Sequence, residues 1–249
     1  MCIRDSMGTT LLESLRNPIV IIKVIILLII IYIVSKLVNK KLNLEQGGFM
    51  KLRKAVLIIH GFAGGTYDEE RLAFYLTMHN YDVFTFTLPG HDKIFFNKVT
   101  KDDWIDSCRN HIEKLIKNGY KNIYVIGHSM GGILASYLAA NYNEVKKLVL
   151  IAPAFKYLTF EENDLNVMSV IKNSPKICED YGTKTIFSRM LQFPTSVIKE
   201  FMHLVDISKE IPSKVSCSTL IIQGDDDKIV PIESSEFVFE HLNTCLLYT

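Results

Sequence analysis

Short apolar runs alternate with longer amphipathic stretches along the chain from Lys54 onward. The apolar runs are rich in Val, Ile and Leu and show no strict alternation with polar residues. They cover residues 55–59, 82–87, 122–126, 147–151 and 219–223. Runs of this kind are typical of parallel strands that are buried on both faces of a sheet.

The stretches between these runs have the spacing of amphipathic helices. They cover residues 68–80, 101–119 and 130–143. Thr100, followed three residues later by Asp103, has the signature of a capping box at the start of the second stretch. The alternation of strands and helices predicts an α/β fold, with a mostly parallel sheet flanked by helices. In such sheets the ligand lies beyond the carboxyl ends of the strands.

An almost wholly apolar run covers residues 19–38, near the N-terminus. Its length is about the 20 residues that a bilayer-spanning helix needs, and Lys23 lies near enough to one end to reach the headgroups. A buried core helix would show a polar stripe, which this run does not. A signal peptide would end in a small-residue cleavage site, whereas this run continues into "SKLVNKKLN". The run predicts an uncleaved transmembrane anchor, with the membrane as a partner.

Basic residues are concentrated on the C-terminal side of this run. Lys36, near the end of the run, and five more lysines and arginines between residues 39 and 54 make up this group, whereas only Arg16 precedes the run in the segment that begins at Met7. The positive-inside rule therefore predicts a single-pass protein with its large domain on the cytoplasmic side.

Composition removes several classes of function. The chain has 249 residues and a formal net charge of +1, which gives no electrostatic footprint for nucleic acid. Its five cysteines are irregularly spaced and do not predict a disulfide framework. No His/Cys group has zinc spacing, and we expect no metal and no cofactor.

Three turns that carry candidate catalytic residues follow predicted strands directly. They are "HGFAGG" at residues 60–65, "GHSMGG" at residues 127–132 and "GDDDKIVP" at residues 224–231. In the second, Ser129 lies between glycines at the point where a strand gives way to a helix, an arrangement that holds a serine hydroxyl out at a helix N-terminus. Singly, such a serine is often just a helix cap, and an Asp cluster is often solvated turn chemistry. All three in this order indicate a nucleophilic serine.

On these motifs, with "LPGHD", "DDW", "LIAPA" and "LIIQ", the sequence resembles the α/β-hydrolase superfamily from about Ala55 to Asn243. It is most similar to the small bacterial carboxylesterases and monoacylglycerol lipases, a group of serine aminopeptidase-like hydrolases. The resemblance implies an α/β-hydrolase fold with Ser129 as nucleophile. It also implies an oxyanion hole formed by the N–H groups of Phe62 and Met130, and an acid, Asp227, that orients a histidine.

A long insertion separates "LIAPA" from the last predicted strand. Residues 162–173 and 196–211 have helical patterns, and the insertion resembles the small helical cap of these esterases, at about residues 155–212. Either a role in an acyl pocket or packing of the cap onto the sheet would suit its apolar side chains. The candidates are Phe155, Tyr157, Phe187, Met190, Leu191 and Phe193.

The two ends of the chain do not resemble the rest. Residues 1–6 and 245–249 back-translate to the two orientations of a transposon-type sequencing adaptor. We therefore expect the natural segment to be residues 7–244, with a hydrolase domain at 54–244 that is truncated at its C-terminus. In the family's order the histidine follows the acid after one more strand. Only His241 follows Asp227, and it lies in a helical pattern, so we expect the base beyond Thr244 and little activity in the chain as written.

The predicted function is that of a membrane-anchored serine hydrolase that cleaves carboxylic esters, such as short-chain esters or monoacylglycerol-like lipids. The same fold also supports aminopeptidase-like, thioesterase or acyltransferase chemistry, or a non-catalytic binding module tethered to the membrane.

Overall fold

In the computed structural model the chain divides into two compact units, Met1–Phe49 and Met50–Thr249. The structure describes residues 54–91, 98–156, 193–227, 229–243 and 245–248 of the second unit, and residues 29, 32–34 and 36 of the first, which are helical. The rest of the predicted anchor at residues 19–38 lies outside the described residues. Within the described ranges, no helix has both the length and the apolar character to cross a bilayer.

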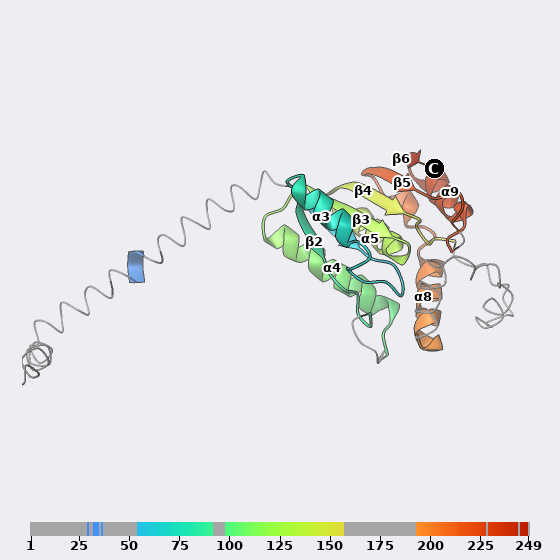
Figure 1. The fold of residues 1–249 in the computed structure, drawn as a ribbon, viewed down its shortest axis with the longest axis horizontal. Helices are drawn as coiled ribbons and strands as arrows, with labels where there is room; N and C mark the ends of the chain where they lie inside the picture. The colour runs from blue at the N-terminus through green and yellow to red at the C-terminus, as the bar shows by residue number, and fades with distance from the viewer. Residues whose placement is uncertain are drawn as a thin grey trace, which may run out of the picture. The chain divides into compact units, whose positions relative to one another are not determined.

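The second unit is built on a parallel sheet, which confirms the predicted architecture. The described strands are β1 (Ala55–Ile59), β2 (Asp82–Thr85), β3 (Ile123–His128), β4 (Val145–Ile151), β5 (Ser218–Ile222) and β6 (Cys245–Tyr248). Their order is β2-β1-β3-β4-β5-β6, and every neighbouring pair is parallel (Figure 1). The strand order reverses between β1 and β3. A ligand crevice is therefore expected beyond the carboxyl ends of these two strands.

Strand β6 differs from the sequence-based expectation. No strand was predicted after the Asp-rich turn, yet Cys245–Tyr248 pairs in parallel with β5, from Thr219 opposite Cys245 to Ile222 opposite Tyr248. The segment "CLLY" is apolar, and the open edge of β5 presents backbone N–H and C=O groups that an added strand satisfies. The sheet of the printed chain therefore continues past β5. The adaptor origin of residues 245–249 stays a prediction.

The helices coincide with the predicted stretches, ending within a few residues of them. They are α3 (Glu70–Met78), α4 (Lys101–Lys117), α5 (Met130–Asn141), α8 (Thr195–Ile207) and α9 (Ile232–His241), with the short 3₁₀ helix η2 (Pro212–Lys214). The predicted capping box is confirmed: the Asp103 amide donates to the Thr100 hydroxyl over 3.3 Å, and the Thr100 amide donates to the Asp103 carboxylate over 2.8 Å. Helix α8 lies in the predicted cap region. The other predicted cap helix lies outside the described residues.

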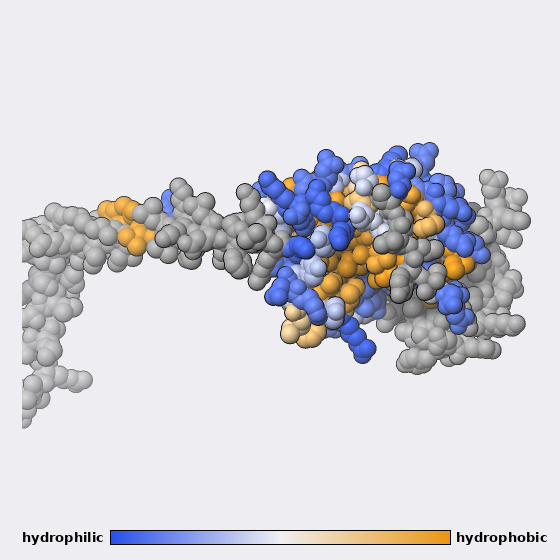
Figure 2. Space-filling view, turned by 90° about the horizontal axis from the view of Figure 1, so that it is seen from above, coloured by the Kyte–Doolittle hydropathy of each residue, from blue (hydrophilic) through white to orange (hydrophobic). Residues whose placement is uncertain are grey.

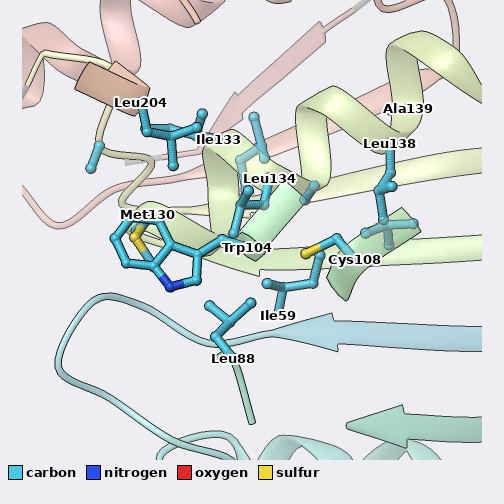
Figure 3. Packing of buried hydrophobic residues seen from close by; sticks show 14 of the residues in the cluster. Ile59, Leu88, Trp104, Cys108, Met130, Ile133, Leu134, Leu138, Ala139 and Leu204 are labelled. Carbon is cyan, nitrogen blue, oxygen red and sulfur yellow. The ribbon is translucent and has the colours of Figure 1, made fainter. Parts of the chain in front are cut away.

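On one face of the sheet, the apolar side chains of β1, β3 and β4 are buried. A single hydrophobic cluster joins this face to α4, α5, α8 and α9. Trp104 of α4 is completely buried, and Figure 3 shows its indole among Leu88, Met130 and Leu134. Burial of a large apolar side chain contributes about 1.5–3 kcal/mol each. This cluster therefore anchors the end of β1 and the start of α5, where the candidate residues lie.

The other face is covered more thinly. Its cluster centres on Val56, Ile58 and Ile126, against which Leu72 and Leu76 of α3 pack. Towards the β5 edge, Ile222 keeps 38% of its surface exposed. Figure 2 shows one face of the unit, on which hydrophobic residues gather in the middle with hydrophilic residues around them. The two faces thus differ in how completely the described residues cover them.

Candidate active site

Ser129 occupies a sharp turn between β3 and α5. Its backbone has φ 54° and ψ −118°, in the left-handed half of φ space that residues with a Cβ rarely adopt. Its amide donates to the Ile151 carbonyl over 2.9 Å, and its own carbonyl accepts from the Gly132 amide over 2.9 Å and from the Ala154 amide over 3.2 Å. Such a backbone costs about 1–3 kcal/mol and persists only where its surroundings hold it.

The glycines on either side of Ser129 are required by backbone packing. A Cβ on Gly127 would lie 2.2 Å from the Gly131 carbonyl oxygen, and a Cβ on Gly131 would lie 2.2 Å from that of Ile59. No side chain fits at either distance. The turn is therefore too tight for side chains at the two glycine positions that flank Ser129.

Two backbone amides near Ser129 come from separate segments. Met130 is the first residue of α5, so its N–H is one of the first-turn amides without an intrahelical partner, at the positive end of the helix dipole. Phe62 lies in the loop after β1, where a Cβ on Gly61 would be only 3.1 Å from the Ser129 Cβ. The side chain of Phe62 packs into the core, stacked on Phe201 at 5.0 Å between ring centroids. Its backbone, by contrast, lies in a loop that faces the serine.

Asp227 is held by the turn after β5. Its Oδ1 accepts hydrogen bonds from the amides of Ile229 over 2.8 Å and Val230 over 3.0 Å, and its Oδ2 lies 3.4 Å from Nε2 of Gln223. Asp225 and Asp226 are exposed, whereas Asp227 is half-buried. The first two carboxylates are therefore open to solvent, whereas Asp227 is held by the turn.

One cavity of about 240 Å³ brings these segments together. Ser129, Asp227 and Phe62 of the predicted set line it. Met130 does not, since its side chain is buried in the core beneath the turn. The remaining lining residues are Gly61, Ala63, Gly64, Asp68, His128, Ala152, Ile229 and Val230. Within the described part of the chain, no group of His, Cys, Asp and Glu side chains is arranged to hold a metal ion.

His60 is buried and hydrogen-bonded through both ring nitrogens. It is 1% exposed; its Nδ1 donates to the Gly61 carbonyl over 2.8 Å, and its Nε2 accepts from the Leu88 amide over 3.0 Å. Burial lowers the pKa of His60, which keeps the ring neutral. Both nitrogens are used, so His60 has no lone pair left to take a proton from Ser129.

His241 lies at the end of α9, as the helical pattern predicted. Its ring is exposed, and its Nδ1 lies 2.7 Å from the Phe237 carbonyl one turn earlier. His111 and His203 also lie on helices, and His79 is the C-cap residue that follows α3. None of these four lines the cavity that contains Ser129.

Sequence reasoning missed a pair that links α3 to the serine turn. The ring of His128, the last residue of β3, has its Nδ1 2.9 Å from Oε1 of Glu69. Burial lowers the pKa of His128, but the hydrogen bond to Glu69 and the charges of Glu69, Asp68 and Asp227 together outweigh it, so the pKa is raised. Glu69 carried no sequence signal because it lies in an ordinary charged stretch, "DEER".

Backbone strain around the cavity was also missed. The described non-glycine residues with positive φ are Ala63 (58°), Asn80 (63°), Ser129 (54°) and Ala152 (43°). Three of them, Ala63, Ser129 and Ala152, line the cavity. Strained residues of this kind cluster at functional sites. Alanine has no special preference for this conformation, so no sequence pattern indicates it.

The acyl-pocket candidates lie partly within the described residues. Phe155 is buried with its ring 6.4 Å from that of Phe237, and the Phe193 ring lies 4.5 Å from that of Phe62. Neither lines the cavity that contains Ser129. Both pack against aromatic side chains, which is the second of the two roles considered above. Tyr157, Phe187, Met190 and Leu191 lie outside the described residues.

The fold and the glycine-flanked serine turn define a class of protein. Residues 54–181 match the family model of the α/β-hydrolase fold, and the chain belongs to that family. Its relatives include a carboxylesterase of Bacillus subtilis (strain 168), 25% identical over 196 residues that cover 77% of this chain and 79% of that protein. A thermostable monoacylglycerol lipase of Bacillus sp. (strain H-257) is 27% identical over 201 residues, covering 76% of each chain. The predicted resemblance to this group is confirmed.

Solved structures support the same fold. One of two metagenome-derived lipolytic enzymes superposes with a TM-score of 0.63 at 23% identity, covering 78% of this chain and 82% of its own. An esterase from Exiguobacterium antarcticum superposes with a TM-score of 0.61 at 17% identity, covering 78% and 82%. At these identities the likeness establishes the fold, and the site carries the argument about chemistry.

Proposed function

We propose that this chain is a serine hydrolase that cleaves carboxylic esters, with short-chain esters or monoacylglycerol-like lipids as its substrates. The observation that carries the proposal is the placement of Ser129: it has a strained backbone at a helix N-terminus and shares one cavity with Asp227 and the Phe62 loop. The carboxylesterase and lipase relatives support an ester as the scissile group.

The proposed reaction has two halves. Ser129 Oγ attacks the ester carbonyl while a histidine takes its proton, and the amides of Phe62 and Met130 stabilise the tetrahedral oxyanion. The intermediate collapses, the C–O bond of the ester breaks, and the alcohol leaves with the proton that the histidine returns. Water then attacks the acyl-enzyme by the same route and releases the carboxylic acid. Asp227 orients the histidine and stabilises its charged form.

The histidine in this scheme follows Asp227 in the family's chain order. We propose that it lies C-terminal to Thr244, since His60 has both ring nitrogens engaged and His241 lies exposed on α9 outside the cavity lining. The test of activity therefore uses the gene product read without interruption past codon 244. The 249-residue chain serves as a comparison, and we expect it to be nearly inactive.

The decisive experiment compares Ser129→Ala with the unaltered gene product on p-nitrophenyl butyrate. We expect kcat/KM to fall by about 10⁴-fold or more, since removal of a nucleophile removes the acyl-enzyme route. Ser213→Ala is the matched control, because Ser213 is exposed and bonds only to the Glu210 carbonyl among the described contacts. Equal rates for Ser129→Ala and wild type would contradict the mechanism.

A substrate panel separates the esterase from its rivals on the same fold. Monoacylglycerols, short-chain esters, acyl thioesters and aminoacyl amides are compared by kcat/KM. The proposal expects the highest values on the two ester classes. An enzyme that prefers thioesters or amides would replace it, and binding of esters with no turnover in the gene product would favour a non-catalytic binding module.

We also propose that the hydrolase domain is tethered to a membrane by residues 19–38, with the domain on the cytoplasmic side. The length and apolarity of that run and the basic residues after it support this proposal. Membrane fractions washed with carbonate at high pH should retain the protein, and deletion of residues 7–38 should release it. Protease added to inverted vesicles should digest the domain, whereas protease added to right-side-out vesicles should not.

A further inference from the structure

On the rim of the cavity, a hydrogen bond joins two segments that are distant in the sequence. Glu69, the N-cap residue of α3, contacts His128, the residue directly before Ser129, over 2.9 Å. The Glu69 side chain is 10% exposed, whereas the His128 side chain is 39% exposed and lines the cavity. A buried carboxylate needs a hydrogen-bonded partner, so Glu69 constrains the position of His128.

The segments that this contact joins are those that hold the two proposed oxyanion donors. The Phe62 amide belongs to the loop between β1 and α3, and the Met130 amide belongs to the turn between β3 and α5. More than sixty residues separate these two amides along the chain. Their relative position depends on contacts across the gap, and an oxyanion hole tolerates about 0.5 Å of error.

Within the loop, a second carboxylate stiffens the end nearest α3. Asp68 accepts from the Gly65 amide over 3.0 Å, and its own amide donates to the Gly65 carbonyl over 3.1 Å. The Gly64 amide donates to the Gly61 carbonyl over 3.1 Å. The loop thus consists of two hydrogen-bonded turns. Because these turns limit its flexibility, a restraint on the position of Glu69 also restrains the position of Phe62.

We propose that Glu69 and His128 are positioning residues whose hydrogen bond holds the Phe62 loop against the serine turn, so that the two oxyanion donors keep their spacing. The inference rests on the proposed function. Neither residue needs to touch the substrate for this role. The prediction is that loss of the contact weakens transition-state binding while substrate binding is retained.

The electrostatic surroundings favour a charged pair. The hydrogen bond to Glu69 and the charges of Glu69, Asp68 and Asp227 stabilise the protonated form of His128, against the effect of burial. When His128 is protonated, the contact is a charge-assisted hydrogen bond, which is shorter and stronger than a neutral one. Glu69→Gln retains an acceptor for the His128 N–H but removes the charge, whereas Glu69→Ala removes both.

Hydrogen exchange tests the restraint without reference to catalysis. In the 249-residue chain, amides at residues 62–65 should exchange about tenfold faster in Glu69→Ala than in wild type, with a smaller change in Glu69→Gln. Glu70→Ala is the matched control, because Glu70 is the next residue on the same helix turn and is exposed. Equal exchange in Glu69→Ala and wild type would overturn the proposal.

Kinetics of the uninterrupted gene product test the consequence. Glu69→Ala should lower kcat about tenfold with KM unchanged, and Glu69→Gln should recover part of the loss. Unchanged kcat in Glu69→Ala, with Ser129→Ala inactive, would overturn this inference alone. Full activity of Ser129→Ala would instead mark failure of the proposed function. Thermal melting of each variant confirms that it is folded under the assay conditions, and loss of kcat that tracks loss of folded protein would count against positioning.

Discussion

The serine turn and the acid turn each follow a parallel strand, yet they are built differently. The serine turn is confined by backbone on all sides: a Cβ on either flanking glycine would overlap a carbonyl at 2.2 Å, and Ser129 itself adopts a left-handed φ of 54°. The acid turn is open. Gly224 has nothing within 4 Å of a Cβ position, and Asp227 is held by the amides of Ile229 and Val230.

The proposed roles of the two turns account for this difference. The hydroxyl of a serine nucleophile lies only one carbon from the backbone, so the backbone of the turn itself must be placed correctly for the oxygen to reach the substrate. A carboxylate that orients a partner needs only its own two oxygens held in direction, and two amide donors on one oxygen do this. The serine turn therefore stores strain in close packing, whereas the acid turn relies on hydrogen bonds and leaves its outer surface to solvent.

The largest expected effect comes from removing the charge of the acid turn while keeping the two backbone hydrogen bonds to Asp227. In Asp227→Asn, Oδ1 can still accept from Ile229 and Val230, so the fold should be retained. The gene product should lose about 10⁴-fold in kcat, or about 5 kcal/mol of transition-state stabilisation, because an amide cannot hold the histidine in its active tautomer. Steady-state hydrolysis measures the loss, and a thermal melt measures the fold. A variant with more than a tenth of wild-type kcat would contradict the assignment of Asp227.

The next effect breaks the packing of the serine turn. Gly131→Ala places a methyl group 2.2 Å from the Ile59 carbonyl oxygen, and the backbone must shift. We expect a loss of about 3 kcal/mol or more in the free energy of unfolding, measured by urea denaturation. Gly132→Ala is the control. Its Cβ would meet Pro153 at 3.0 Å, a contact at the limit of what packing absorbs, so its loss should be clearly smaller. Equal losses would show that the glycine of the motif is not special.

This contrast also explains what could be predicted from the sequence. The strands and the turn at Ser129 were predicted because apolar runs and the glycine spacing around Ser129 are local patterns, and each has a local physical cause. Strand β6 was missed because its pairing depends on the open edge of β5, far away in the sequence. The Glu69–His128 contact and the strained Ala63 and Ala152 were missed for the same reason: they arise where separate segments meet, and nothing in "DEER" or "LIAPA" records that meeting.

A smaller effect is a pH dependence of stability that arises from His128, beside the serine turn. The pKa of His128 is raised in the folded protein, mainly by Glu69 once burial is offset. The charge of the pair then adds stability that is fully present below the unfolded value of about 6.5 and is lost as pH rises through the folded pKa. His128 is more than a third exposed, so the gain should stay under about 1 kcal/mol.

Urea denaturation at pH 5.5 and pH 9 measures that gain. The difference between wild type and Glu69→Gln should be larger at pH 5.5 and should shrink at pH 9. Glu70→Gln, on the exposed side of the same helix turn, should show no such change between the two values. A constant difference for Glu69→Gln across the two pH values would mean that the contact carries no charge.

The smallest effect, Gly224→Ala, tests the open construction of the acid turn. Nothing lies within 4 Å of the added methyl group, and Gly224 is not among the described glycines with positive φ. Alanine restricts the unfolded chain more than glycine does, so we expect a stability change of zero to a gain of about 0.5 kcal/mol, with kcat within twofold of wild type. The same substitution thus has opposite consequences in the two turns. A loss above about 1 kcal/mol at Gly224, measured alongside Gly131→Ala, would mean that the acid turn is as tightly packed as the serine turn, and the distinction between them would fail.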